Sequence, residues 1–363
     1  MISREPKIKP KIDISLCTRD MNMPPIDKVH SMDEDSFELF VQEWLFGCRS
    51  KDYAKIEQLG GAGDKGRDIV ASCINGQEDF YQCKHYDSPL SPSEYYVEFG
   101  KLVYYTMSGD YNVPRKYYIV ASHDIGPSLK KLVDDPIKLK DELKTNWNTY
   151  CKKEITKTQE VLLDSVMIQY IDSFDFSIVE HLPIQQIIND HIKTIYGKIR
   201  FGGLVIDAPT SVEPSAEIET EEKEMPYVKE LLRAYSEKVN KDIKSIEDLT
   251  TYPECKENFN RQRKDYYAIE TIERFVRDTF TNDDEFKKLK EEIFNGIIEV
   301  HEEKYDNGFE RLKADLKQAV MVNTQKSLLD SHLNLIGNAQ RKGTCHKLVN
   351  DNRIKWVNDD KNV

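Results

Sequence analysis

The stretch GGAGDKGRDIVASCINGQEDFYQCKHY, residues 60–86, decides the fold of the N-terminal half of this 363-residue chain. Its alternation of apolar and polar positions predicts two strands, over 67–73 and 80–86. Asn75-Gly76 lies between them and is a strong signal for a tight turn. We therefore expect an antiparallel hairpin.

Polar side chains interrupt one face of this hairpin. Asp68 lies on the same face of the first strand as Val70, and Gln82 and Lys84 share one face of the second. If the strands pair, these polar groups meet at one end of the sheet. The preceding glycines permit a tight turn and close backbone approach to a ligand; they are Gly60, Gly61, Gly63 and Gly66.

Neighbouring segments complete an α/β domain. Helical spacing over 31–46 and 93–107 and strand-like runs over 53–58 and 116–121 give the order α-β-β-β-α-β. Ser31 and Glu34 fit a capping box at the start of the first helix. Later patterns predict a helix over 184–196 and a strand near Leu204.

The first helix supplies two candidate carboxylates for the polar end of the sheet. Glu38 falls on one edge of its apolar stripe, beside Leu45, and Glu43 falls on the other edge, beyond Phe40. We favour Glu38, because Glu43 fits an ordinary surface position.

The four residues Asp68, Gln82, Lys84 and Glu38 suit metal-assisted phosphodiester hydrolysis. The two carboxylates, with the Gln82 carbonyl as a weaker ligand, can hold a hard cation such as Mg²⁺ or Mn²⁺. A lysine ammonium can orient the attacking water or neutralise charge in the transition state. Taken alone, Asp68 is more commonly a residue that caps a turn, and Lys84 more commonly an edge-strand residue that prevents aggregation. Their combination predicts a catalytic site.

Phe37-Glu38, GDKGRD (63–68) and YQCK (81–84) together resemble the PD-(D/E)xK nuclease superfamily in its QxK form, as in Mrr-type restriction endonucleases. The resemblance implies a restriction-endonuclease-like fold, with a mixed central sheet flanked by helices, and Mg²⁺-dependent DNA cleavage. It implies Asp68, Gln82 and Lys84 as the catalytic core with Glu38 added from the helix, and it matches Asp64 to a loop acid. Gln82 replaces the usual Glu or Asp, which leaves the number of metal ions open.

Basic residues near these motifs are candidate DNA contacts. Residues 115–157 hold ten basic side chains against six acids, which suits a surface that follows the phosphate backbone. Ordinary solvated helix charge is the alternative. The candidates are Lys65, Arg67, Arg115, Lys116, Lys130 and Lys131. His85 and Cys83 lie on the opposite strand face from Lys84 and are expected to pack against a helix.

The C-terminal half has a different pattern. Residues 207–225 contain seven acids and one lysine without apolar periodicity, which predicts an acidic linker. Apolar steps of three and four then predict helices that include the stripes 228–246, 269–276, 286–297 and 309–320. We therefore divide the chain into an N-terminal arm (1–30), an endonuclease domain (31–206), the linker (207–225) and an all-α domain (226–363).

The segment RKGTCHKLVNDNRIKWV (341–357) resembles the terminal signature of effector subunits of ABC three-component systems, on Gly343, Cys345, His346, Leu348, Asn350 and Trp356. The whole chain then resembles the nuclease effector of Lamassu-type defence against phage and plasmids. This implies an SMC-like coiled-coil ATPase and a third, small subunit as partners, double-stranded DNA as substrate and a homo-oligomer as the active form. The helical domain would dock the nuclease into the complex. A zinc site at Cys345-His346 is not expected, because the usual ligand spacing is absent.

Composition limits the alternatives. The net charge of −12 argues against an open basic surface that coats nucleic acid, so we expect weak DNA binding by the chain alone. No apolar run approaches the length of a membrane span, and the seven cysteines contain no C-x-x-C pair, so a cytoplasmic protein without membrane contact is expected. Two other functions stay open: a stand-alone nuclease that recognises modified DNA, and a catalytically inactive DNA-binding or assembly subunit.

Overall fold

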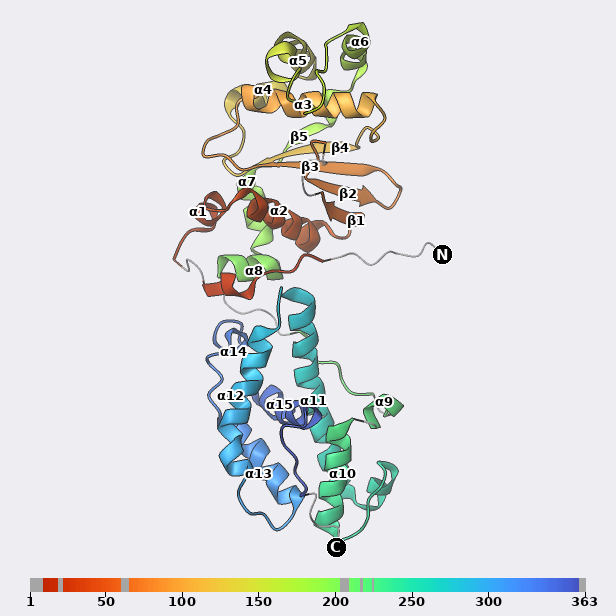
Figure 1. Ribbon diagram of the computed structural model, residues 1–363, viewed down its shortest axis with the longest axis vertical. Coiled ribbons are helices and arrows are strands. Elements are labelled where there is room, and N and C mark those ends of the chain that lie inside the picture. The colour runs from red at the N-terminus through yellow and green to blue at the C-terminus, as the bar shows by residue number, and fades with distance from the viewer. Residues whose placement is uncertain are drawn as a thin grey trace. The chain divides into compact units, whose positions relative to one another are not determined.

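The chain folds into two compact units (Figure 1). The structure is a computed structural model, and it describes residues 9–18, 22–59, 65–202, 209–215, 218–223 and 225–358. The N-terminal unit comprises Met1–Pro10 and Arg19–Gly203, and the helical unit comprises Lys11–Thr18 and Leu204–Val363.

A mixed five-stranded sheet forms the centre of the N-terminal unit. Its strands run in the order β1-β2-β3-β4-β5, with antiparallel β1/β2 and β2/β3 pairs and parallel β3/β4 and β4/β5 pairs. The strands are β1 Tyr53–Gln58, β2 Ile69–Cys73, β3 Glu78–Lys84, β4 Lys116–Ala121 and β5 Val179–His181. The expected hairpin is confirmed, with Gly76 in the left-handed region at φ +84°.

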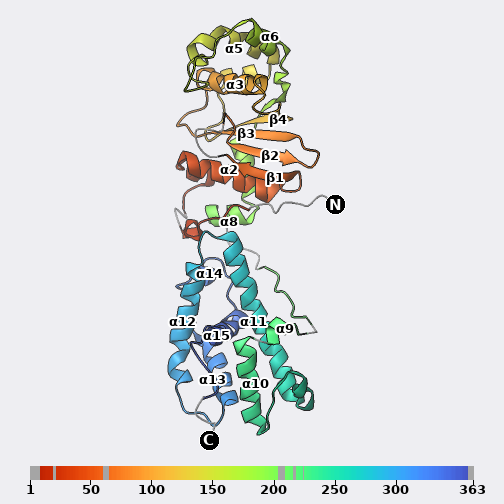
Figure 2. The ribbon, with the colours of Figure 1, turned by 45° about the vertical axis from the view of Figure 1, so that its right-hand side comes forward.

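Helices cover both faces of this sheet (Figures 1 and 2). On one side α3 forms the crossover between the parallel strands β3 and β4, and it packs with Val70 and Phe80 in one apolar core. On the other side lies α2, whose Trp44 ring meets Tyr81. The helices of this unit are α1 Pro25–His30, α2 Glu34–Arg49, α3 Pro92–Met107, α4 Pro127–Val133, α5 Pro136–Tyr150, α6 Ser165–Ser173, α7 Ile184–His191 and α8 Ile195–Phe201.

The start of α2 differs from the prediction. Ser31 and Glu34 do not form the expected capping box, because Ser31 terminates the short helix α1 that precedes it. Asp33 caps α2 instead, and its Oδ1 accepts a hydrogen bond from the Ser36 N–H at 2.7 Å. The predicted helix over 184–196 is divided into α7 and α8, and the strand expected near Leu204 lies outside the described residues.

The helices of the second unit confirm the apolar stripes predicted after the acidic linker. The stripe over 228–246 is not one helix, however, since α10 ends at Val239 and Asn240 takes a left-handed conformation at φ +55°. The helices of this unit are α9 Thr220–Lys223, α10 Pro226–Val239, α11 Pro253–Thr279, α12 Asp284–His301, α13 Gly308–Met321, α14 Leu328–Ser331 and α15 Asn338–Asn350.

The C-terminal segment 341–357 is part of the core of the helical unit. Gly343 of α15 lies so close to α11 that a Cβ there would sit 2.1 Å from the Asp265 carbonyl oxygen. His346 is fully buried and its Nε2 lies 3.1 Å from Gln262 Oε1. Trp356 is also fully buried and donates from Nε1 to Asp315. These residues therefore hold the helices together.

The expected linker and N-terminal arm are partly built into the helical unit. Glu222, from the acidic run, is buried and accepts two hydrogen bonds from the Arg263 guanidinium, at 2.7 and 2.8 Å. Ile12 of the expected arm is fully buried and bridges Phe280. The predicted linker 207–225 is thus anchored to the helical unit at Glu222 by the ion pair with Arg263. Across the described part of the chain, no helix combines the length and apolar character that crossing a membrane requires.

Candidate functional site

A small polar cavity of about 190 Å³ lies at one end of the central sheet. It forms where β3 ends, beside the residues that precede β2 and the first turns of α2. All four predicted catalytic residues line it. The lining residues are Glu34, Phe37, Glu38, Asp68, Gln82, Cys83, Lys84, His85, Tyr86 and Lys101.

Asp68 is held in place by the neighbouring strand. Its Oδ2 accepts a hydrogen bond of 2.6 Å from the Cys83 backbone N–H, and the side chain is 5 % exposed. Burial raises the pKa of its carboxyl to about 7, although Lys84 and the Cys83 N–H favour the charged form. Glu38 and Glu98 add to the rise. The cavity thus places carboxyl groups close enough to oppose one another's ionisation.

Gln82 contributes an oxygen that lacks a partner. The residue is 2 % exposed, and its Oε1 accepts no hydrogen bond from any described group. An orphaned buried carbonyl is costly unless water or a cation satisfies it. Its position in the cavity beside Asp68 and Glu38 therefore fits a bound cation.

The structure separates the two candidate carboxylates of α2. Glu38 lines the cavity and accepts a hydrogen bond of 2.9 Å from Gln58 Nε2 on β1. Glu43 is fully buried elsewhere, where Arg200 donates to both of its oxygens at 2.9 and 2.7 Å and His191 Nε2 lies 3.2 Å away. Burial would raise the pKa of Glu43, but these partners hold it below its usual value. The expectation that Glu43 is a surface residue is wrong.

Lys84 reaches the cavity from the end of β3 and has a buried partner that the sequence reading missed. Its Nζ lies 2.8 Å from Glu98 Oε1, and the Lys101 Nζ lies 3.1 Å from the same oxygen. Glu98 is 2 % exposed; burial would raise its pKa, but the two lysines lower it below the usual value. A signal did exist, since Glu98 follows Tyr95 by three positions and precedes Leu102 by four, on the apolar stripe of α3.

The donor set fits a hard cation of the Mg²⁺ class. Asp68 and Glu38 offer carboxylate oxygens and Gln82 a carbonyl oxygen, and cations of this class take oxygen ligands. Within the described ranges, no group of three or more His, Cys, Asp or Glu side chains is arranged to hold a metal. A cation held here would therefore have to use the Gln82 amide oxygen beside the two carboxylates.

The glycine-rich loop can be described only in part. Gly60, Gly61, Gly63 and Asp64 lie outside the described residues. Gly66 is described and takes φ +80°, where a Cβ would lie 3.1 Å from Lys101 Cβ and 3.2 Å from Glu98 Oε2. The absence of a side chain at Gly66 thus lets the backbone at this residue lie close to Lys101 and Glu98.

None of the six candidate DNA contacts lines the cavity. Lys116, at the start of β4, pairs with Glu180. Arg115 donates to Asp79, which lies opposite Lys116 on β3. Lys84 lies at the other end of β3, opposite Ala121. On α4, Lys130 pairs with Asp134 and Lys131 is exposed.

Two further candidates lie nearer the glycine loop. Lys65 forms an ion pair with Asp110, and the guanidinium carbon of Arg67 lies 4.2 Å from the centroid of the Tyr111 ring. The nearby His85 packs as expected against α2, edge-on to Phe37, and its Nε2 lies 3.2 Å from the Val29 carbonyl oxygen.

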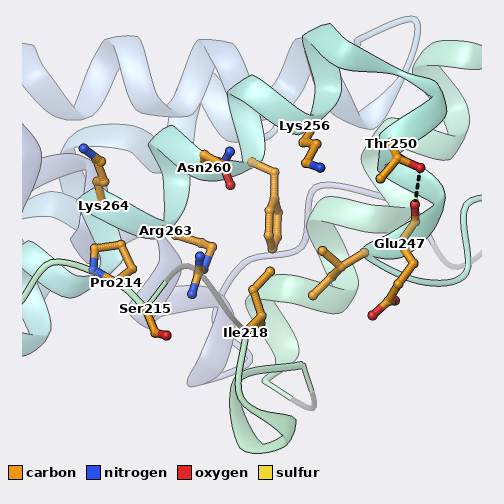
Figure 3. Close-up of a pocket in the computed structure, with 11 residues that line it drawn as sticks. Pro214, Ser215, Ile218, Glu247, Thr250, Lys256, Asn260, Arg263 and Lys264 are labelled. Carbon is orange, nitrogen blue, oxygen red and sulfur yellow. Dashed lines mark hydrogen bonds between the residues drawn. The ribbon is translucent and has the colours of Figure 1, made fainter.

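A larger cavity of about 520 Å³ lies in the helical unit (Figure 3). Figure 3 shows Lys256, Asn260 and Lys264 on α11 facing the segment that carries Pro214 and Ile218. Its lining includes one acid, Glu247, and two of its cations are paired, Arg263 with Glu222 and Lys264 with Glu213. It lacks the combination of acids and lysine found at the end of the sheet, so the smaller cavity is the candidate catalytic site.

Comparison with known proteins identifies the helical half. Residues 224–356 match the family model of C-terminal domain 6 of the ABC-three component (ABC-3C) systems. The match supports membership of the chain in such a multi-subunit system. No curated protein and no solved structure matches the chain.

Proposed function

We propose that this component of an ABC-three component system is a metal-dependent DNA endonuclease whose active site is the cavity at the end of β3. The observation that carries the proposal is the convergence of Asp68, Gln82, Lys84 and Glu38 on one cavity from β3, the residue before β2, and α2. The order of elements and the mixed sheet are those expected for the PD-(D/E)xK class.

Asp68, Glu38 and Gln82 would hold the cation. When bound, Mg²⁺ would polarise the scissile phosphate and lower the pKa of a water molecule. The Cys83 N–H fixes one Asp68 oxygen, so the carboxylate keeps its orientation. The Gln58 amide does the same for Glu38.

Lys84 would act directly on the reacting phosphate. Its ammonium carries three N–H donors, one of which Glu98 engages. The lysine can therefore donate to a phosphoryl oxygen and offset the charge that builds up in the transition state. Burial would lower the pKa of Lys84, but Glu98 and Asp68 raise it above its usual value, so the ammonium stays charged.

The helical unit would connect the nuclease to its partners. We propose an SMC-like ATPase and a third, small subunit as these partners, with foreign or host DNA cut after activation. A single site cuts one strand, so double-strand cleavage calls for an oligomer of the nuclease. The match over 224–356 favours such a component over a stand-alone nuclease that reads modified DNA.

The test measures metal binding and cleavage with the full chain. We expect Mn²⁺ binding, followed by calorimetry, that is lost in Asp68→Asn, and Mg²⁺-dependent plasmid cleavage that is lost in Asp68→Ala and Lys84→Ala. Glu78→Gln, at the opposite end of β3, is the control and should change neither. Plasmid cleavage that persists in Lys84→Ala or Asp68→Ala would refute the assignment. Mn²⁺ binding that is absent from the wild type would favour an inactive DNA-binding or assembly subunit.

A further inference from the structure

Glu98 is an unusual residue for the interior of α3. Its neighbours on the apolar stripe, Tyr95, Phe99 and Leu102, are buried in the core against the sheet. A leucine at this position would complete the stripe, whereas a buried carboxylate must be compensated by opposite charge. Glu98 is compensated by two lysines on a single oxygen, Oε1.

Two other buried ion pairs are built differently. Glu43 with Arg200 and Glu222 with Arg263 each use both carboxylate oxygens against one guanidinium. That bidentate geometry satisfies the acid and fixes two elements together. Glu98 instead leaves Oε2 without a hydrogen-bond partner among the described groups. Both lysines thus share the same oxygen of Glu98, Oε1.

Both lysines that Glu98 engages line the catalytic cavity. Lys84 is 20 % exposed in its side chain and Lys101 is 23 % exposed. Lys101 comes from α3, one turn after Glu98, and it faces the same cavity as the end of β3. Each ammonium gives one donor to Glu98 and keeps two others, so both can also meet an anion.

Gly66 lies against this cluster. A side chain at Gly66 would press on the aliphatic part of Lys101 and on Glu98 Oε2, at 3.1 and 3.2 Å. The Tyr111 hydroxyl ties the two segments together by donating to the Lys65 and Lys101 carbonyl oxygens, at 3.2 and 3.4 Å. These contacts restrict the position of Lys101 beside the cavity.

We propose that Lys101 is a second phosphate-binding residue of the nuclease site and that Glu98 is the positioning residue for both lysines. Two ammonium groups fixed on one carboxylate oxygen would grip different oxygens of the same phosphate or of neighbouring phosphates in the cut strand. The inference rests on the proposed nuclease function, and it adds a substrate contact and a support that the QxK motif does not contain.

The first experiment observes the cluster without measuring activity. In the full chain, ¹⁵N-edited NMR of lysine NH₃⁺ groups should show Lys84 and Lys101 as ordered signals, each assigned by its loss in Lys84→Ala or Lys101→Ala. Both should broaden or disappear in Glu98→Gln, which keeps the size of the side chain and removes its charge. Retention of both signals in Glu98→Gln would overturn the role of Glu98.

The second experiment measures DNA binding in EDTA, which withholds the metal and prevents cleavage. Lys101→Ala should bind a short duplex about tenfold more weakly at low salt, and its plot of log K against log salt should be shallower by about one unit. Lys290→Ala is the matched control, since Lys290 has a similar exposure of 22 % and a single ion pair of 2.8 Å, with Asp351. It should bind like the wild type.

A third measurement separates positioning from binding. Under Mg²⁺, Glu98→Gln should lower the single-turnover cleavage rate more than tenfold while the concentration for half-maximal rate changes little. Normal DNA affinity in Lys101→Ala, with the wild type still cutting DNA, would overturn this inference and leave the nuclease assignment intact. Wild-type protein that binds neither Mn²⁺ nor DNA while the NMR signals persist would instead refute the nuclease function, and the phosphate role of Lys101 with it.

Discussion

Glu38 and Glu43 offer a controlled comparison, because both are glutamates on the same helix, α2, five positions apart. We predict that Glu38→Ala abolishes metal binding and cleavage with little change in stability. We predict that Glu43→Ala destabilises the N-terminal unit strongly. The two acids differ in their surroundings, so the helix itself cannot explain opposite results.

The magnitudes follow from those surroundings. Glu38 is partly exposed and accepts a hydrogen bond from the Gln58 amide, so its removal should cost about 1 kcal/mol. Glu43 is fully buried, and its removal leaves the Arg200 guanidinium, 6 % exposed, without its counter-charge. Breaking a buried ion pair on one side costs about 3–5 kcal/mol, which lowers the melting temperature by roughly 10 °C for a unit of this size.

The assay is urea unfolding of the full chain, followed by tryptophan fluorescence and circular dichroism, together with Mn²⁺ calorimetry. A double variant, Glu43→Leu with Arg200→Leu, should recover much of the stability, because no unpaired charge remains. Wild-type stability in Glu43→Ala would refute the reasoning about the buried pair. A loss of several kcal/mol in Glu38→Ala would refute the functional assignment, since it would make Glu38 structural.

Three further predictions test other parts of the structure. Gly66→Ala forces a side chain into the left-handed region at about 1–2 kcal/mol and pushes on Glu98, so cleavage should fall further than stability, as a paired unfolding and cleavage assay would show. Gly343→Ala brings a Cβ against the Asp265 carbonyl, and overpacking of this kind should cost at least about 1–3 kcal/mol in denaturant unfolding of the helical unit. Burial lowers the pKa of His346 from 6.5 to about 3. Below pH 6.5 the unfolded chain therefore binds a proton at this histidine that the folded chain does not. The free energy of unfolding should fall with pH for this reason, by about 2 kcal/mol at pH 5. His346→Gln should remove that part of the acid sensitivity in melting curves recorded from pH 7.5 to 5, and an unchanged profile would contradict it.

Much of the fold could be predicted because its determinants are local. The hairpin follows from strand alternation and one Asn-Gly turn, and the helices of the second unit follow from apolar steps of three and four. The grouping of Asp68, Gln82 and Lys84 needed only the strand period and the pairing of two adjacent strands. Helix ends were less predictable, since Asp33 rather than Ser31 caps α2 and Asn240 ends α10 early.

The remaining features depend on contacts between distant residues. Glu43 looked like a surface acid because its partners, His191 and Arg200, follow about 150 positions later, and nothing in the local pattern around Glu43 reveals them. Glu222 likewise lies in an acidic run whose sequence predicts a linker, and its partner Arg263 lies about 40 positions later in the chain. Glu98 was different, because its place on an apolar stripe was visible in the sequence and should itself have marked it as a buried, paired carboxylate.

The C-terminal signature gains a physical meaning from its burial. Gly343, Cys345, His346 and Trp356 are buried in the helical unit, and Asn350 caps α10 by accepting from the Tyr227 N–H at 2.9 Å. The four buried residues cannot contact a partner while the unit is folded. The signature therefore identifies the domain by its internal packing; if the helical unit docks partners as proposed, exposed positions would have to select them. Substitutions in the signature should impair assembly only as far as they unfold the unit, and surface substitutions that leave its melting temperature unchanged are the ones that can map the partner-binding face.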